Sequence, residues 1–256
     1  MRLLGSVRRR RAERALERNR DYQRTKARWV EEEGDFVVVS VCAPRAEHVR
    51  SAIEAVAPLS PDKRVLEVGS GAHGNVFFLG HPNAVGVDPM AREYKALFPG
   101  WQGRCETIEA FGEHLPFPDA SFDVVISDNV VDHAEDPGGI AREIVRVTRP
   151  GGVIYFAVNV HHPIYDAMSR AYSAWVLVGS PLEVSAFADH TVHLTAGAAR
   201  RLFDGLPVER LEESVDVESA SRLARESKPR HLGDRLKRVF FKNALYELVA
   251  RRLATC

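Results

Sequence analysis

Short apolar runs alternate with segments of helical periodicity through the middle of the chain. The apolar runs are rich in β-branched residues and are bounded by glycine, proline or charged residues, as is typical of buried strands. They predict strands over residues 64–68, 84–88, 122–127 and 152–158, with helices near 75–80, 91–98 and 137–148. Strands that alternate with helices indicate a parallel sheet covered on both faces. The pattern predicts an α/β fold with a Rossmann-like, doubly wound and mostly parallel sheet.

The two ends of the chain show different patterns. Residues 8–32 contain no glycine or proline and are rich in Arg, Ala, Glu and Leu, which predicts one helix. Pro44 suits the first turn of a second helix that runs to about Ala57. The remaining patterns predict a helix over 194–206, an antiparallel edge hairpin over 208–217 and an amphipathic helix over 234–253.

Charge is balanced overall but unevenly distributed. The 256 residues carry 35 Lys and Arg against 35 Asp and Glu. Residues 1–28 hold 11 basic and 3 acidic side chains, and residues 222–256 hold 10 and 3, which leaves 14 basic and 29 acidic side chains between them. An acidic body with two basic ends fits helices whose charged faces are solvated. It also fits attraction to an anionic surface, a phosphorylated substrate or nucleic acid.

The cysteines and the lengths of the apolar runs indicate where in the cell the protein is expected. Cys42, Cys105 and Cys256 form no C-x-x-C pair, which argues against a disulfide framework and against a cysteine zinc site. Reduced cysteines fit the cytoplasm, which is the expected location. No apolar run approaches the roughly 18 residues of a membrane span. The arginines at positions 8–11 leave no room for the apolar core of a secretory signal.

A glycine-rich loop is the clearest candidate for a binding site. The sequence Glu67-Val-Gly69-Ser-Gly71-Ala-His-Gly74 follows a predicted strand and precedes a predicted helix. Glycines allow a sharp turn and let a ligand approach the backbone. Asp88 ends the next predicted strand, where an acid suits hydrogen bonds to ribose hydroxyls. Together these features predict a cofactor that contains a nucleoside.

Two further motifs indicate which cofactor it is. Residues 115–123 read Leu-Pro-Phe-Pro-Asp-Ala-Ser-Phe-Asp before one strand, and Arg149-Pro-Gly-Gly152 precedes the next. With the glycine loop, this order resembles the class I S-adenosylmethionine-dependent methyltransferases, in particular their broad small-molecule branch with the LPFxDxSFD signature. The resemblance covers residues 62–159. It implies S-adenosylmethionine as the cofactor and a small-molecule acceptor as the partner.

The resemblance also implies roles for individual residues. The cofactor-binding set comprises Glu67, Gly69, Ser70 and Gly71 beside the methionine part, Asp88 at the ribose, Met90 at the adenine, Glu113 near the adenine amino group, and Asp128 and Asn129 near the amino acid part and the methyl group. His73 stands where the family commonly has its third loop glycine. Phe111 stands where an acid often contacts adenine, which leaves Glu109 or Glu113 for that contact.

Histidines that follow strands are the candidate catalytic residues. His133 comes just after the strand at 122–127, and His162 comes just after the strand at 152–158, where ligands of open α/β sheets bind. An alcohol acceptor needs a base, and imidazole can supply one near neutral pH. His190 and His193 are predicted to be structural. No spacing motif supports a metal site.

The predicted reaction moves a methyl group to an oxygen of a small hydroxylated acceptor, such as a sugar-like or specialised metabolite. The alternatives are N- or C-methylation of a small molecule or lipid, a nicotinamide-dependent oxidoreductase, and a binding module without activity. An acidic domain suits a cationic sulfonium better than the pyrophosphate of a dinucleotide, which needs a helix N-terminus free of acids.

The predicted organisation has three parts. Residues 1–60 form a basic N-terminal helix and a lead-in. Residues 61–220 form the methyltransferase domain, with an insertion at about 160–193 on the acceptor side that carries aromatic residues. Residues 221–256 form a basic, amphipathic C-terminal helix. The oligomeric state is left open.

Overall fold

The computed structural model describes residues 2–177, 192–226 and 232–254. Its centre is a seven-stranded sheet in the order β3-β2-β1-β4-β5-β7-β6. The strands are β1 (Val65–Val68), β2 (Ala84–Val87), β3 (Glu106–Ile108), β4 (Phe122–Asp128), β5 (Thr148–Val160), β6 (Val208–Asp216) and β7 (Ala244–Arg252). Strands β1 to β5 pair in parallel, whereas β7 is antiparallel to both β5 and β6. The predicted α/β fold with an antiparallel edge is confirmed.

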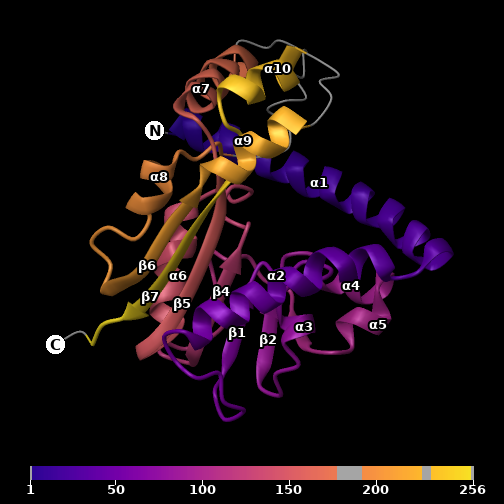
Figure 1. Ribbon diagram of the computed structural model, residues 1–256, viewed down its shortest axis with the longest axis vertical. Coiled ribbons are helices and arrows are strands. Elements are labelled where there is room, and N and C mark those ends of the chain that lie inside the picture. Colours follow the sequence, from indigo (N-terminus) through magenta and orange to yellow (C-terminus); the bar gives the residue numbers. More distant parts are fainter. Residues whose placement is uncertain (1, 178–191, 227–231, 255–256) are drawn as a thin grey trace.

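Helices cover both faces of this sheet (Figure 1). They are α1 (Arg2–Glu33), α2 (Phe36–Glu54), α3 (Val76–Leu79), α4 (Ala91–Leu97), α5 (Pro99–Gln102), α6 (Pro137–Val147), α7 (Pro163–Leu177), α8 (Ala196–Arg201), α9 (Val217–Glu226) and α10 (Leu232–Val239). Alternate residues of a strand point to opposite faces. In β4, Val124 and Ile126 therefore pack with α2, α3 and α4, while Val125 packs with α6 and α8.

The C-terminal region corrects two predictions. Residues 208–216 form a single strand rather than a hairpin, and the helix predicted over 234–253 is a short helix, α10, followed by β7. Tyr246, Leu248 and Ala250 alternate along β7 and are buried with α6 and α8. Leu245, Leu248 and Val249 have the spacing of one helical face, which explains the helix prediction, but backbone hydrogen bonds to β5 and β6 make this segment a strand.

Two other elements differ from prediction. Pro44 lies inside α2, which begins at Phe36, so the apolar run over 36–42 forms the first turns of that helix. β3 is a strand of only three residues, too short for the sequence pattern to identify. It pairs with β2 and closes one edge of the sheet.

Motif residues 115–123 lie before and at the amino end of β4. The Asp123 carboxylate accepts hydrogen bonds from Arg149 Nη1, at 3.0 and 3.1 Å, and from the Arg64 amide at 2.8 Å. Arg146 donates to the carbonyls of Leu115 and Phe117. This motif therefore fixes the start of β4 and its approach to β5.

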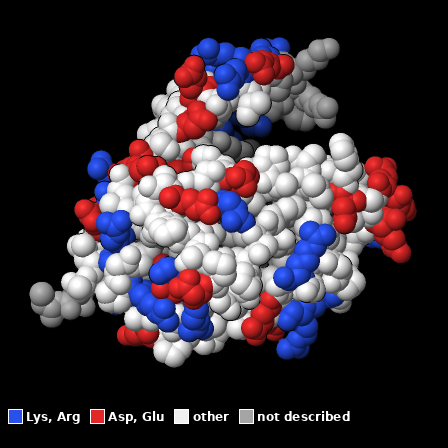
Figure 2. All heavy atoms as spheres, turned by 60° about the horizontal axis from the view of Figure 1, so that its bottom comes forward, with Lys and Arg blue, Asp and Glu red and all other residues white. Residues whose placement is uncertain are grey.

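Helix α1 runs across the molecule above α2 and α4 (Figure 1). Gly34, with φ +83°, makes the turn into α2. Arg20 forms an ion pair with Glu93 of α4 at 2.6 Å, and Asn19 Nδ2 donates to the Tyr94 hydroxyl at 3.0 Å. Within the described ranges, no helix is long and apolar enough to cross a membrane. Side chains of both charge signs are interspersed over the face drawn in Figure 2.

Candidate functional site

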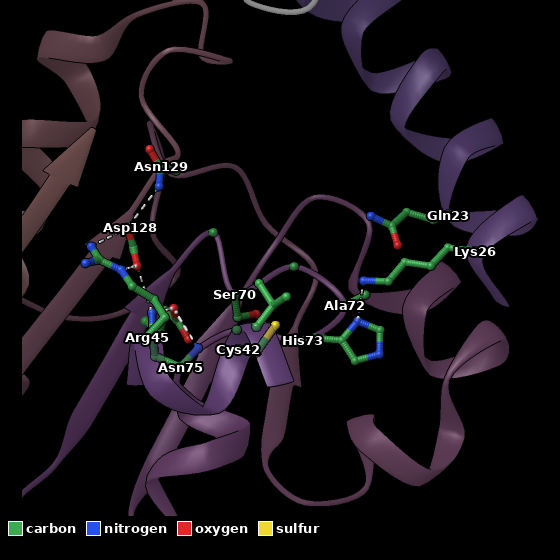
Figure 3. A pocket seen from close by; sticks show the side chains of 15 residues that line it. Gln23, Lys26, Cys42, Arg45, Ser70, Ala72, His73, Asn75, Asp128 and Asn129 are labelled. Atoms are coloured by element: carbon green, nitrogen blue, oxygen red, sulfur yellow. Dashed lines mark hydrogen bonds and ion pairs between the residues drawn. The ribbon is translucent and has the colours of Figure 1, made fainter. Parts of the chain in front are cut away.

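The strand order reverses between β1 and β4, and a cavity opens at their carboxyl ends. Open α/β sheets bind ligands at this position, because the loops that follow two such strands diverge there. The cavity has a volume of about 290 Å³ (Figure 3). Its lining comes from α1, α2, β1 with the loop that follows it, and the end of β4: Gln23, Lys26, Val41, Cys42, Arg45, Glu67, residues 69–75, Asp128 and Asn129.

Two glycines give this loop its shape. Gly69 and Gly71 have φ of +76° and +56°, in the left-handed region that favours glycine. A Cβ atom on Gly69 would overlap the Val130 side chain, whereas a Cβ on Gly71 would meet open space. Gly69 therefore lets the loops after β1 and β4 touch. Gly71 leaves bare backbone that a ligand can approach.

The Glu67 side chain is hydrogen-bonded to the end of the glycine loop and the start of α3. Its carboxylate accepts hydrogen bonds from the amide of Asn75 at 3.1 Å, the side chain of Asn75 at 2.7 Å and the amide of Val76 at 2.9 Å. These amides belong to the first turn of α3, whose positive end favours an anion. Burial raises the pKa of Glu67 to about 7, although these hydrogen bonds oppose the shift.

Asp88 joins the end of β2 to the same loop. Its Oδ2 accepts a hydrogen bond from the Gly71 amide at 3.0 Å, and its Oδ1 accepts one from the Met90 amide at 2.8 Å. Burial raises the pKa of Asp88 to about 6. The Met90 side chain is fully buried against Tyr94. A carboxylate beside bare backbone offers the hydrogen-bond acceptor that ribose hydroxyls need, so these residues fit a nucleoside.

Asp128 and Asn129 form the other end of the cavity. Arg45 of α2 donates to both Asp128 oxygens, at 2.8 and 3.0 Å, and to Glu247 of β7 at 3.0 Å. Asn129 has a left-handed backbone, with φ +58°, and its Nδ2 donates to Asp128 at 3.2 Å. Its buried Oδ1 has no hydrogen-bond partner among the described residues. That oxygen is an acceptor available to the cationic part of a ligand.

Sequence reasoning missed the residues that reach the cavity from the N-terminal helices. Gln23 and Lys26 come from α1, and Val41, Cys42 and Arg45 come from α2. Lys26 Nζ lies 3.2 Å from His73 Nδ1. The mismatch with the family pattern at His73 was a signal, since an imidazole replaces a glycine there. No local pattern singled out Lys26 or Arg45.

Glu113, His133 and His162 do not line the cavity. Glu113 accepts hydrogen bonds from the amides of Glu135 and Asp136, at 3.1 and 3.3 Å, and so anchors the loop before α6. His162 Nδ1 accepts from the Ile164 amide at 3.3 Å. Its ring packs against two phenylalanines that precede β7.

His133 lies in the loop that leaves the cavity after Asn129. Its Nε2 is 3.8 Å from Oδ1 of Asp132, whose side chain is fully buried, while half of the His133 side chain is exposed. Neighbours on a helix would not face each other, but residues 131–133 form a turn. The turn thus places a buried carboxylate beside an accessible imidazole.

Two other histidines are buried near this loop. The rings of His161 and His193 lie 5.0 Å apart, and His161 Nδ1 accepts a hydrogen bond from the Asn243 amide at 3.2 Å. His190, in the predicted insertion, lies outside the described residues. Among the residues that are described, no three His, Cys, Asp or Glu side chains are grouped so that they could hold a metal ion.

Comparisons with known proteins agree with this geometry. Residues 66–156 match the family described as methyltransferase domain. An uncharacterized methyltransferase from Mycobacterium sp. (strain JLS) is 39% identical over 110 residues, which cover 42% of this chain and 43% of that protein. One from Mycobacterium tuberculosis (strain ATCC 25177 / H37Ra) is 34% identical over 101 residues, which cover 38% and 40%. The chain thus spans less than half the length of the curated relatives it matches.

Solved structures share the fold at low identity. Geranyl diphosphate C-methyltransferase from Streptomyces coelicolor A3(2) has a TM-score of 0.59 at 11% identity, over 82% of this chain and 79% of that one. The YcgJ protein from Bacillus subtilis has a TM-score of 0.56 at 17% identity, over 82% and 100%. Residues 66–156 thus match a methyltransferase domain, and the solved structures share its fold.

Proposed function

We propose that this protein transfers a methyl group from S-adenosylmethionine to a small acceptor. One observation carries the proposal: the Asp88 carboxylate, after β2, is held 3.0 Å from the amide of Gly71 in the loop after β1, which is the strand beside the reversal of the strand order. This contact puts a buried carboxylate next to bare, left-handed backbone. A nucleoside would find hydroxyl partners at Asp88 and room along the loop.

The residues around the loop would hold the parts of the cofactor in order. Asp88 would bind the ribose and Met90 would contact the adenine. Glu67, Gly69, Ser70 and Gly71 would lie beside the methionine part, and Asp128 and Asn129 would face its amino group. Glu113 would act at a distance, through the loop before α6. When bound, the cofactor supplies an electrophilic methyl group on a sulfonium. The protein would position the cofactor and the acceptor relative to each other and would exclude water from the reacting atoms.

We further propose that the acceptor is a small hydroxylated molecule and that the methylated atom is oxygen. The support is His133, an exposed imidazole 3.8 Å from a buried carboxylate in the loop that continues from the cavity. Asp132 would orient the imidazole, so that His133 can act as a base. His162 is the second candidate base, at the end of β5.

Calorimetry on the full chain tests the cofactor. S-adenosylmethionine and its product S-adenosylhomocysteine should bind, and NADH should not, because the acids at the loop oppose a pyrophosphate. Absence of binding at millimolar S-adenosylmethionine and S-adenosylhomocysteine would overturn the proposal. Tight binding of NADH alone would favour an oxidoreductase instead. Mass spectrometry of a screen of hydroxylated acceptors then identifies the methylated atom.

A further inference from the structure

Lys26 reaches the cavity from α1, a helix that lies outside the matched methyltransferase segment. Figure 3 shows its side chain directed toward His73 across the rim of the cavity. The two nitrogens are 3.2 Å apart. An ammonium can only donate, so His73 Nδ1 must accept and its proton must lie on Nε2.

His73 gives Lys26 no compensating charge. Its side chain is buried against Phe98 and Trp101, with ring centroids 4.6 and 5.4 Å away. Burial, with Lys26 as a further cause, lowers the pKa of His73 to about 3, so the imidazole is neutral at pH 7. Burial also lowers the pKa of Lys26. The ammonium is thus partly desolvated, and the neutral His73 ring does not serve as its counter-ion.

A comparison of the charged side chains that line the cavity sets Lys26 apart. These are Lys26, Arg45, Glu67 and Asp128. Arg45 is paired with Asp128 and Glu247. Lys26 has no carboxylate within ion-pair distance in the part of the chain that the structure describes. It therefore offers a positive charge, and two N–H donors beyond the one used by His73, to an anionic group in the cavity.

We propose that Lys26 binds the α-carboxylate of the cofactor's amino acid part, so that the bound cofactor holds α1 against the domain. The inference rests on the proposed function. Asp88 and Met90, which would take the nucleoside, do not line this cavity, and the residues that do would face the amino acid part. The α-carboxylate is the anionic group of that part. In this arrangement His73, which stands where the family commonly has a glycine, would orient the Lys26 side chain.

The test compares two ligands that differ in the amino acid part. S-adenosylhomocysteine carries the α-carboxylate, whereas 5′-methylthioadenosine keeps the nucleoside and has no amino acid. In calorimetry at pH 7.5, K26M should weaken S-adenosylhomocysteine binding at least tenfold and change 5′-methylthioadenosine binding less than twofold. K26R should keep affinity for both ligands within threefold. R24M is the matched control, because Arg24 lies on the same helix with a side chain that is 58% exposed. It should change neither affinity.

The other outcomes overturn the inference. Equal weakening of both ligands in K26M would mean that Lys26 acts only through the packing of α1. Unchanged S-adenosylhomocysteine binding in K26M would leave the proposed function standing and remove Lys26 from the site. Absence of S-adenosylhomocysteine binding by the wild-type protein would instead defeat the proposed function itself.

A salt titration of the wild-type protein gives a measurement that depends on no variant. Raising NaCl should weaken S-adenosylhomocysteine binding and leave 5′-methylthioadenosine binding unchanged, because only the first ligand has the charged amino acid part, whose carboxylate would face Lys26. Equal responses of the two ligands would overturn the inference even if K26M failed to fold.

Discussion

Arg45 and Asp128, 83 residues apart in the sequence, form a two-pronged ion pair at the carboxyl end of β4. The Asp128 side chain is 8% exposed and that of Arg45 is 26% exposed. The same guanidinium reaches Glu247 of β7 and the Tyr155 hydroxyl of β5. One side chain of α2 thereby forms hydrogen bonds to β4, β5 and β7 near the end of the sheet where the cavity lies.

Replacing Arg45 should destabilise the protein strongly. Arg45→Met leaves the largely buried Asp128 without its cation, and we expect the free energy of unfolding to fall by about 3 kcal/mol. Arg142→Met is the control, because it breaks an exposed ion pair with Asp136 and should cost less than about 1 kcal/mol. Urea unfolding followed by circular dichroism measures both. Equal losses would contradict the structural role given to Arg45.

Alanine at the two loop glycines should have unequal effects. Both positions have positive φ, which costs about 1 kcal/mol or more for alanine. Gly69→Ala adds an overlap with the Val130 side chain, whereas Gly71→Ala meets open space. The free energy of unfolding, from urea titrations, should therefore fall by at least about 1 kcal/mol more for Gly69→Ala. A larger loss for Gly71→Ala would refute this account of the loop.

Asp88→Ala should reduce cofactor affinity. The change removes the carboxylate expected to bind the ribose, and hydrogen bonds to a charged group are worth about 1.5–3 kcal/mol. Calorimetry should show S-adenosylhomocysteine binding roughly tenfold weaker or more. Asp62→Ala is the control, since Asp62 is a fully exposed acid at the opposite end of the sheet. Wild-type affinity in Asp88→Ala would remove Asp88 from the site.

Because Glu67 titrates, the stability of the cofactor-free protein toward unfolding should fall as the pH rises. Its pKa is raised from 4.5 to about 7 in the folded protein, so the folded state binds its proton more tightly than the unfolded state does. The stability that comes from this proton is complete below about pH 4.5 and is lost as the pH rises through 7. Glu67→Gln should flatten the pH dependence of the melting temperature between about pH 5 and 8. An unchanged slope in this variant would show that Glu67 does not titrate there.

His133→Ala should impair methyl transfer while sparing cofactor binding. General bases contribute about 10²–10⁴ in rate, so single-turnover transfer to a hydroxylated acceptor should fall at least about tenfold. His133→Asn should not restore the rate, because an amide cannot take the proton. His162→Ala, measured in parallel, tests the second candidate base. Undiminished transfer by His133→Ala from pH 6 to 9 would exclude His133 from the mechanism.

The sequence by itself determined the parallel sheet and the position of the glycine loop. Strands β1, β2, β4 and β5 are short β-branched runs that alternate with helices, and this pattern is local. Asp88 could also be placed at the loop, because it ends the strand next to β1 and parallel strands end at one edge. Such inferences need only short-range periodicity and the rules of strand order.

Tertiary structure decided which other side chains reach the cavity and which segments form the antiparallel edge of the sheet. Lys26 and Arg45 lie on helices that precede the sheet, and β7 could be recognised as a strand only from its pairing with β5 and β6. Glu113 supports a loop, and a turn brings Asp132 close to His133. The physical reason is that these contacts join segments far apart in sequence, as with Arg45 and Glu247 at 202 residues, or depend on a backbone turn that residue types alone do not specify.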